Sequence, residues 1–391
     1  MSERRSVWNG VALVATLGVA AAVAVVAVTR SDRKQAAPAP SPSVSPSPSP
    51  SRSPGALDGI GPYVVYASGS DVFAFDVASG KSTPVGSLDG RPVSYRSQQP
   101  GRGAIVAFPT SEGHVWTVTR DGLKRIGDAP AAAGDFFQGA ALSPDDHRLA
   151  TAGQQPPYSV VVVDLRSGHA TAIARKGPTG YPAGSSLPIA WGLGGTVLYH
   201  VPICECDGVD PGLFALDVGA GTSAPVQEMR STLLLGRSVV AQSGQALFYG
   251  TRTPRACGPR EQGTPCEGPP FSFRRLAAGR RAAQVLARSS EASFDPVAIS
   301  DDGRTLLVVR IDARTKAIRI ERYADDGRKL STPRGVPKAA LPVALLPGDA
   351  IVALTQASPL KLSVVREGHA RTATTLRSDD PFELAYLGWL A

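Results

Sequence analysis

The chain has 391 residues, a formal net charge of +8 and a sequence pI near 9.5. Its 41 glycines and 34 prolines suit many short strands joined by turns, and no long stretch after residue 30 has helical periodicity. An all-helical fold is therefore excluded. The length is sufficient for one large all-β domain, since such domains often exceed 200 residues without dividing.

The first feature in chain order is an apolar run. Residues 11–28 are almost entirely Val, Ala, Leu and Gly, and with their neighbours they reach about 20 residues, enough to cross a ~30 Å hydrocarbon core. We expect a cytoplasmic tail over residues 1–10 and a transmembrane anchor over 11–29. A cleaved signal peptide is the alternative, although its apolar region is usually shorter. Basic residues on both sides leave the positive-inside rule undecided.

A Pro/Ser-rich linker follows the apolar run. Residues 36–54 read AAPAPSPSVSPSPSPSRSP, which has too little apolar surface to fold. We expect residues 30–58 to be a disordered, extended spacer that could hold a domain up to about 60 Å from the bilayer. Such a stalk suits an extracytoplasmic domain. We therefore expect a single-pass protein of the cell membrane, with residues 59–391 outside.

Glycine turns recur along the remaining chain and divide it into repeats. The turns are at Gly80, Gly122, Gly168, Gly221, Gly279, Gly327 and Gly368, spaced 41 to 58 residues apart. Each follows an apolar strand, and three strands end in Asp, which can cap the turn. A period near 40–50 residues with four short strands per repeat is typical of a β-propeller. The sequence thus predicts seven blades.

The two clearest repeats also share the turn between their first and second strands. Residues 142–149 (LSPDDHRL) parallel residues 299–306 (ISDDGRTL). With the Asp-to-Gly turn of residues 163–168, these stretches resemble the repeat of TolB-type, WD-repeat-like β-propellers. Asp146 and Asp301 depart from that pattern, where the family prefers Gly and Pro. The resemblance implies a propeller over about residues 60–391, and with the stalk it indicates a bacterial, actinobacterial-like source; it implies little about chemistry.

The innermost strands of the seven blades can be predicted from the repeats. They are near residues 93–95, 138–142, 187–191, 238–242, 295–300 and 341–346, and at the C-terminus, residues 383–390. The first strand of the domain, residues 63–67, aligns with a second strand. We therefore expect residues 383–390 to supply the inner strand of blade one and close the ring, which protects the sheet edges.

Four cysteines lie in two predicted loops of neighbouring blades: Cys204, Cys206, Cys257 and Cys266. Two disulfides in an oxidising compartment are the main interpretation, either through a local 257–266 bridge or through links between the loops. A 204–206 bridge would be strained. A metal site and a free thiol pair are the alternatives, but Cys-x-Cys spacing is poor for zinc and no His is close.

Propellers usually bind ligands on the face that carries the inter-blade loops and the loops between second and third strands. On that face the sequence offers five candidates: Tyr158, Glu205, Asp207, Arg255 and Arg260. Arginines concentrate in blade five, which favours an anionic envelope ligand or an acidic protein as partner. Nucleic acid is excluded as a partner, because no aromatic residues interleave with the arginines.

No catalytic constellation is recognisable. The five histidines form no local triad or ligand cluster, no GxSxG elbow is present, and we expect no metal or cofactor. The sequence therefore favours a membrane-tethered, extracytoplasmic propeller that binds a protein or envelope ligand without catalysis. The alternatives are an enzyme of the lyase, glycosidase or quinoprotein type with its site over the central channel, and a purely structural scaffold.

Overall fold

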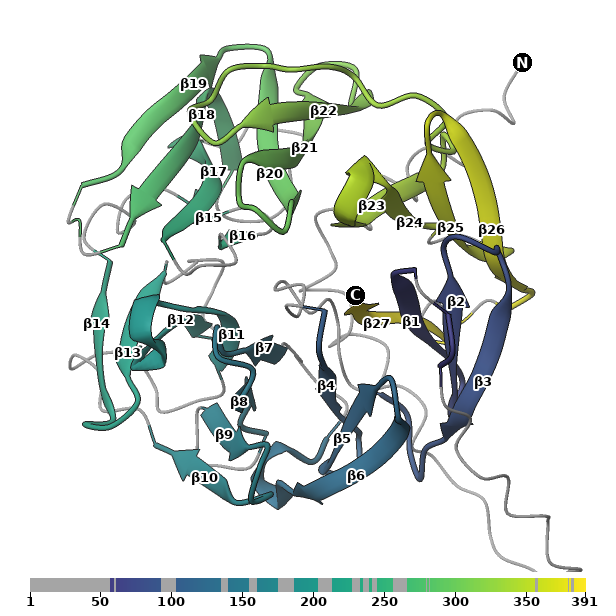
Figure 1. The fold of residues 1–391 in the computed structure, drawn as a ribbon. Coiled ribbons are helices and arrows are strands. Elements are labelled where there is room, and N and C mark those ends of the chain that lie inside the picture. Colours follow the sequence, from purple (N-terminus) through teal and green to yellow (C-terminus); the bar gives the residue numbers. More distant parts are fainter. Residues whose placement is uncertain are drawn as a thin grey trace, which may run out of the picture. The chain divides into compact units, whose positions relative to one another are not determined.

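Short segments rich in β-branched and aromatic residues form antiparallel strands, and these strands build seven sheets around a ring (Figure 1). The computed structural model describes residues 57–59, 61–92, 103–134, 140–154, 160–174, 186–202, 213–226, 233–234, 239–240, 245–255, 266–278, 280, 282–355, 358–378, 380 and 383–391. The predicted all-β, seven-bladed β-propeller is confirmed.

The strands of each blade follow one another from the inner to the outer edge of its sheet. Blade 1 contains β27 (Leu384–Leu390), β1 (Tyr63–Ser68), β2 (Asp71–Asp76) and β3 (Ser82–Ser87); blade 2 contains β4 (Val106–Pro109), β5 (His114–Thr119) and β6 (Gly122–Asp128); blade 3 contains β7 (Ala140–Leu142), β8 (Arg148–Ala152), β9 (Val160–Asp164) and β10 (Ala170–Ile173). Blade 4 contains β11 (Ser186–Trp191), β12 (Val197–Pro202), β13 (Phe214–Asp217) and β14 (Thr222–Pro225).

Blade 5 contains β15 (Leu233–Leu234) and β16 (Val239–Val240), which both pair with β17 (Ala246–Arg255), then β18 (Cys266–Ala277) and β19 (Gln284–Ser289). Blade 6 contains β20 (Ala292–Ile299), β21 (Thr305–Asp312) and β22 (Ile318–Ala324); blade 7 contains β23 (Ala340–Leu345), β24 (Ile351–Thr355), β25 (Leu360–Arg366) and β26 (His369–Leu376). In the described part of the chain, three short 3-10 turns lie between strands: η2 (Pro130–Ala132), η3 (Leu193–Gly195) and η5 (Pro347–Asp349).

The two clearest sequence repeats form the same turn. The Ser143 hydroxyl accepts a hydrogen bond from the backbone N–H of Arg148, and the Ser300 hydroxyl accepts one from Thr305, both at 2.9 Å. Each hydroxyl also donates to the aspartate two residues further on. The serine and the aspartate therefore close the turn between the first and second strands.

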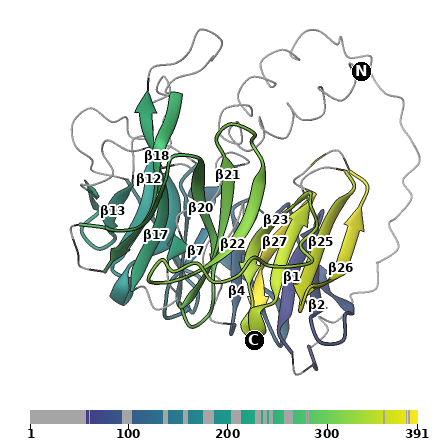
Figure 2. The same cartoon turned by 90° about the horizontal axis from the view of Figure 1, so that it is seen from above.

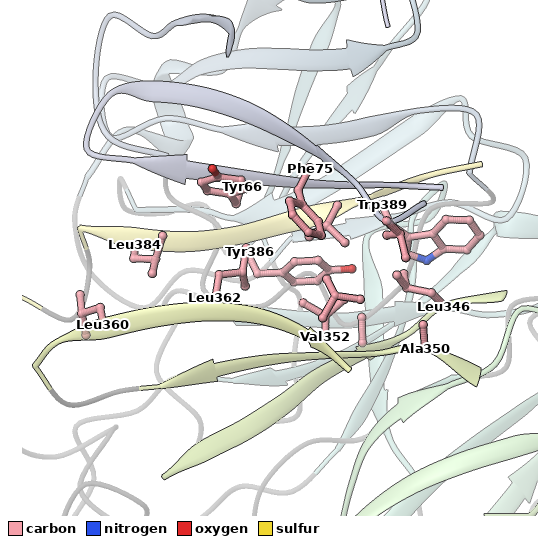
Figure 3. Close-up of a cluster of buried hydrophobic side chains, with 14 residues drawn as sticks. Tyr66, Phe75, Leu346, Ala350, Val352, Leu360, Leu362, Leu384, Tyr386 and Trp389 are labelled. Carbon is pink, nitrogen blue, oxygen red and sulfur yellow. The ribbon is translucent and has the colours of Figure 1, made fainter. Parts of the chain in front are cut away.

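The core is divided among the interfaces between blades. The described residues form seven clusters of buried apolar side chains, and each cluster lies between one pair of neighbouring blades around the ring. The cluster between blades 7 and 1 includes Phe75, Leu362, Tyr386 and Trp389 (Figure 3). Because every sheet is covered on both faces by its neighbours, no blade can bury its own apolar surface alone.

The C-terminal strand closes the ring. β27 pairs antiparallel with β1, and Tyr63 lies opposite Leu390 while Val64 lies opposite Trp389. The register shifts between Val65 and Tyr66, opposite Gly388, which has a φ of 156°. The predicted closure by the C-terminal strand is confirmed, since β27 is the innermost strand of the sheet that begins with β1 (Figure 1).

Three blades differ from the expected four strands: blade 5 has five, because β15 and β16 both pair with β17, and the described sheets of blades 2 and 6 have three. In blade 2 the inner strand expected at residues 93–95 lies outside the described residues, and a single bridge joins Pro92 to Thr110. In blade 6 the outer position has no regular strand among the residues that the structure describes. The anchor expected over residues 11–29 and most of the linker also lie outside the described residues. Within the described ranges, no helix is long and apolar enough to span a membrane.

Candidate ligand-binding site

Most of the residues proposed for the ligand face fall outside the part of the chain that the structure describes. Tyr158, Glu205, Asp207 and Arg260 lie outside the described residues, as do Cys204, Cys206 and Cys257. Arg255 and Cys266 lie opposite each other at the last pair of the β17–β18 ladder. The ligand face and the disulfide pairing therefore remain predictions.

The inner strands are mainly apolar. The described ones consist of Ala, Val, Leu, Ile, Pro, Phe, Tyr, Trp, Gly and Ser, with one carboxylate, Asp295 of β20. Arg252 of β17 places Nη2 3.9 Å from Asp295 Oδ2. Burial raises the pKa of Asp295 to about 6, and the Arg252 charge opposes that rise. Asp295 can therefore exchange a proton near neutral pH.

A group of charged side chains joins the loop after β3 to strands β5 and β6 of blade 2. Asp89 Oδ2 lies 2.6 Å from Nδ1 of His114 and 3.1 Å from Nη1 of Arg125. Arg125 also pairs with Asp128, whose Oδ1 is 3.9 Å from the second nitrogen of His114. The positive and negative charges of this group balance one another, so its first role is to hold the loop after β3 against blade 2. Among the described residues, no group of three or more His, Cys, Asp or Glu side chains could hold a metal ion.

A pocket of about 360 Å³ lies between blades 7 and 1. Blade 1 contributes the end of β2 and the turn after it, and blade 7 contributes the hairpin of β25 and β26. The apolar side chains Phe75, Val77 and Val364 are buried at its base. The lining also includes four exposed, ionisable side chains: Arg366, Glu367, His369 and Arg371.

The local sequence accounts for this arrangement. Arg366 and His369 lie opposite each other at the end of the β25–β26 ladder, joined by Glu367 and Gly368 at φ values of 52° and 83°. Two consecutive positive φ values are typical of the tight type I′ hairpin, whose twist matches that of the strands. The hairpin therefore presents both basic side chains at the same end. Arg371 lies further along β26 and donates to the carbonyl of Ala78, 3.1 Å away.

The pocket is lined by more basic than acidic side chains. Two arginines and an imidazole surround one carboxylate, Glu367, whose Oε1 is 3.9 Å from Nε of Arg366. The excess of guanidinium groups favours an anionic ligand, because arginine binds carboxylates and phosphates through paired hydrogen bonds. The buried apolar base favours a ligand that also has an apolar part.

The sequence alone did not predict this pocket. Its two halves are about 290 residues apart in the chain, and they become neighbours only because β27 places blade 7 beside blade 1. The available signal was the pair of glycine turns, at Gly80 and Gly368, which occupy equivalent places in adjacent blades once the ring is closed. The pocket lies beside these turns between third and fourth strands, whereas the predicted ligand face carries the other loops.

The likeness of this chain to known proteins is confined to solved structures of low sequence identity. No protein-family model and no curated protein match it by sequence. Similar solved structures include TolB from Acinetobacter baumannii, at 12% identity and a TM-score of 0.40, covering 71% of this chain and 64% of that chain. An oligogalacturonate lyase in complex with manganese matches at 16% identity and a TM-score of 0.42, covering 61% of this chain and 65% of that chain.

A chain of a nidogen/laminin complex matches at 12% identity and a TM-score of 0.43, covering 84% of this chain and 98% of that chain. This chain spans less than two thirds of the Acinetobacter baumannii TolB chain and of the manganese-bound lyase chain, but 85% of a putative TolB from Agrobacterium tumefaciens. The pairing of the strands, independently of these neighbours, establishes a seven-bladed β-propeller, the fold that the resemblance to TolB-type repeats had implied.

Proposed function

We propose that this propeller is a non-catalytic binding module, and that the pocket between blades 7 and 1 takes an anionic group joined to an apolar body. The observation that carries the proposal is the combination of a buried apolar base with two exposed arginines and one imidazole around it. The apolar inner strands also support binding at the rim over chemistry at the channel. An anionic component of a cell envelope would provide such a ligand.

The proposal can be tested with the full chain and two small probes, hexyl phosphate and hexanol, in isothermal titrations. We expect hexyl phosphate to bind and hexanol to bind at least about tenfold more weakly, because only the phosphate can pair with the guanidinium groups. The double variant Arg366→Gln/Arg371→Gln should lose about tenfold or more in affinity for hexyl phosphate.

A matched control is available in Arg288→Gln/Arg304→Gln, which removes the same charge from two exposed arginines in blades 5 and 6. This control should bind hexyl phosphate like the unmodified chain. Equal losses in both double variants would mean that only the net charge matters, and the pocket would then not be the site. Thermal melting of each variant checks that the fold is intact.

We further propose that the module is attached to the outer side of a cell membrane by residues 11–29, with the Pro/Ser-rich linker as its spacer. The support is the length and composition of the apolar run together with the stalk that follows it. In intact cells, an added protease should then remove the propeller, and a tag at the N-terminus should stay protected. A propeller that resists protease until the cells are broken would contradict this orientation.

One observation favours a second function, an enzyme with its site over the channel. Asp295 lies on an inner strand and has a pKa of about 6, which is suitable for general acid–base catalysis near neutral pH. Turnover of an oligouronide or an aryl glycoside by the full chain, lost in the variant Asp295→Asn, would favour this function over simple binding.

A further inference from the structure

Blade 6 has a half-open outer edge. Its described sheet ends at β22, whereas blades 1, 3, 4 and 7 have a fourth strand outside the third (Figure 1). The chain after β22 covers only the last part of that strand. The backbone N–H of Arg322 donates to the carbonyl of Ser331 at 3.0 Å, and its carbonyl accepts from the backbone N–H of Leu330 at 2.9 Å. The backbone N–H of Ala324 donates to the carbonyl of Arg328 at 2.8 Å.

The chain then leaves the edge for reasons visible in its sequence. Pro333 and Pro337 have no N–H to continue a ladder. Gly335, at a φ of 76°, approaches blade 7 so closely that a Cβ there would lie 2.0 Å from the carbonyl oxygen of Gly368. The segment that could have formed a fourth strand is therefore committed to the neighbouring blade.

Ile318 and Ile320 lie in the first half of β22, whose outer edge the following chain does not cover. In an antiparallel ladder, alternate residues direct their N–H and C=O groups to opposite sides. Arg322 and Ala324 bond outward, and Ile318 and Ile320 have the same parity, so their backbone groups also face outward. No backbone group among the described residues pairs with them on that side. In Figure 2, the β21–β22 hairpin that carries them extends past β23.

The side chains at this edge suit a particular kind of partner. Ile318 is 43% exposed and Leu330 40% exposed, and these are the two large apolar side chains most open to solvent in the described parts of the chain. Arg314, Lys316 and Arg319 are exposed around Ile318. The nearest carboxylate on β22, Glu321, is only 7% exposed and is already bonded to Lys329 at 2.7 Å. The edge is therefore apolar and basic.

We infer that this edge binds an extended, acidic and apolar segment of a partner protein, which adds to blade 6 as its missing outer strand. Main-chain hydrogen bonds to Ile318 and Ile320 would supply affinity, and the basic side chains would select acidic residues in alternate positions. A second copy of this chain is a poor occupant, because pairing two such edges would bring the basic side chains of one copy, Lys316 and Arg319, close to those of the other. The site is separate from the pocket between blades 7 and 1.

The inference is tested with dye-labelled peptides on the full chain, by fluorescence anisotropy. The probe is the acetylated pentapeptide of sequence Glu-Val-Glu-Val-Glu, and its counterpart has Lys in place of Glu. We expect the acidic peptide to bind at least about tenfold more tightly than the basic one. N-methylation of the two valines removes two amide donors and should abolish binding. Bound acidic peptide should slow hydrogen exchange at Ile318 and Ile320.

Charge reversal provides the matched variant. In Lys316→Glu/Arg319→Glu, the preference should invert, so that the basic peptide binds and the acidic one does not. This gain of binding cannot come from unfolding. Arg366→Gln/Arg371→Gln should leave peptide binding unchanged, which separates this site from the proposed pocket. Unaltered preference in the charge-reversed variant, tight binding of the N-methylated peptide, or concentration-dependent dimers that cover this edge would each overturn the inference.

Discussion

Carboxylates at the ends of strands hold the turns of this propeller. Asp164 Oδ1 accepts backbone hydrogen bonds from Arg166 and Ser167, and Asp312 Oδ1 accepts them from Arg314 and Thr315. The Ser167 and Thr315 bonds respectively lower the pKa of these two carboxyl groups most. Since a depressed pKa means that the folded state prefers the ionised form, these turns stabilise the fold above the unfolded pKa and lose that contribution as the pH falls.

We therefore expect acid to destabilise the chain through such turns, and Asp164→Asn to reduce that sensitivity. The amide oxygen of Asn can still accept the two backbone hydrogen bonds, but it has no charge to lose. The measurement is the melting temperature between pH 7 and pH 3. The variant should melt lower than the unmodified chain at pH 7, with the gap narrowing as the pH falls. A constant gap would rule out the proposed linkage.

Asp295 should have the opposite effect, because burial raises its pKa to about 6. A raised carboxyl pKa means that the fold prefers the protonated form, so this group favours folding at low pH and opposes it as the pH rises through 4 to 6. Asp295→Asn removes the titration. Relative to the unmodified chain, the variant should gain about 2 kcal/mol in unfolding free energy between pH 4 and pH 7, measured in urea. A pH-independent difference would contradict this assignment.

Blades 2 and 3 approach each other closely where the β9–β10 turn meets β6. A Cβ on Gly168, in the β9–β10 turn, would lie 2.4 Å from the carbonyl oxygen of Ile126 in β6. A Cβ on Gly127 would meet the carbonyl oxygen of Gly168 at the same distance. The glycine of a turn therefore serves both the local backbone conformation and the spacing between two elements.

The two contributions can be separated by comparing two glycines of similar conformation. Gly168 has a φ of 73° and Gly69 a φ of 61°, but a Cβ on Gly69 would meet nothing within 4 Å. Gly69→Ala should cost only the backbone strain, about 1 kcal/mol, whereas Gly168→Ala should cost about 2–4 kcal/mol because blades 2 and 3 must also move apart. Urea unfolding measures both. Equal costs would show that the blades separate freely.

The integrity of the whole ring depends on its last strand. Trp389 of β27 is 1% exposed and packs between blades 1 and 7, beside Tyr386 and Leu346 (Figure 3). Of the other tryptophans, Trp191 of β11 is equally buried but lies inside the chain, between blades 3 and 4. The two residues are matched in size and burial, and they differ in whether their strand closes the ring.

Trp389→Ala and Trp191→Ala should each destabilise the chain by about 3–5 kcal/mol. Only Trp389→Ala should also release β27 without global unfolding, because no short turn links β27 to its partner β1, whereas β11 is followed directly by its partner β12. Native-state hydrogen exchange of residues 384–390 distinguishes the two variants. If β27 exchanged equally slowly in both, closure would not depend on the Trp389 contacts.

Local chemistry made much of the fold predictable. The Ser-x-Asp turns at Ser143 and Ser300, the Asp-capped turn after Asp164 and the glycine spacing all act within a few residues, so they could be recognised in the sequence. Closure by β27 was predictable because β1 lacked an inner partner. The fate of the chain after β22 was not predicted, since it depends on how Gly335 meets Gly368 in another blade.

The pocket was beyond the sequence for the same physical reason. Phe75 and Arg371 lie near opposite ends of the sequence that forms the propeller, and each alone looks like an ordinary strand residue. Only the closed ring makes them neighbours. The prediction of a ligand face with Tyr158, Glu205, Asp207, Arg255 and Arg260 depends on where propellers usually bind their ligands. The role of these residues stays a prediction.

The pairing of Tyr63 with Leu390 also sets an order of assembly. During synthesis from the N-terminus, Tyr63 leaves the ribosome 327 positions ahead of Leu390. Until β27 follows, the side chains that blade 1 contributes to the cluster between blades 7 and 1 have nothing to cover them. Nascent blades can stack on one another in sequence, but the circle becomes complete only after β27 has been made. A chain stalled before β27 is made would therefore be an intermediate with an open seam, and a natural client for a chaperone.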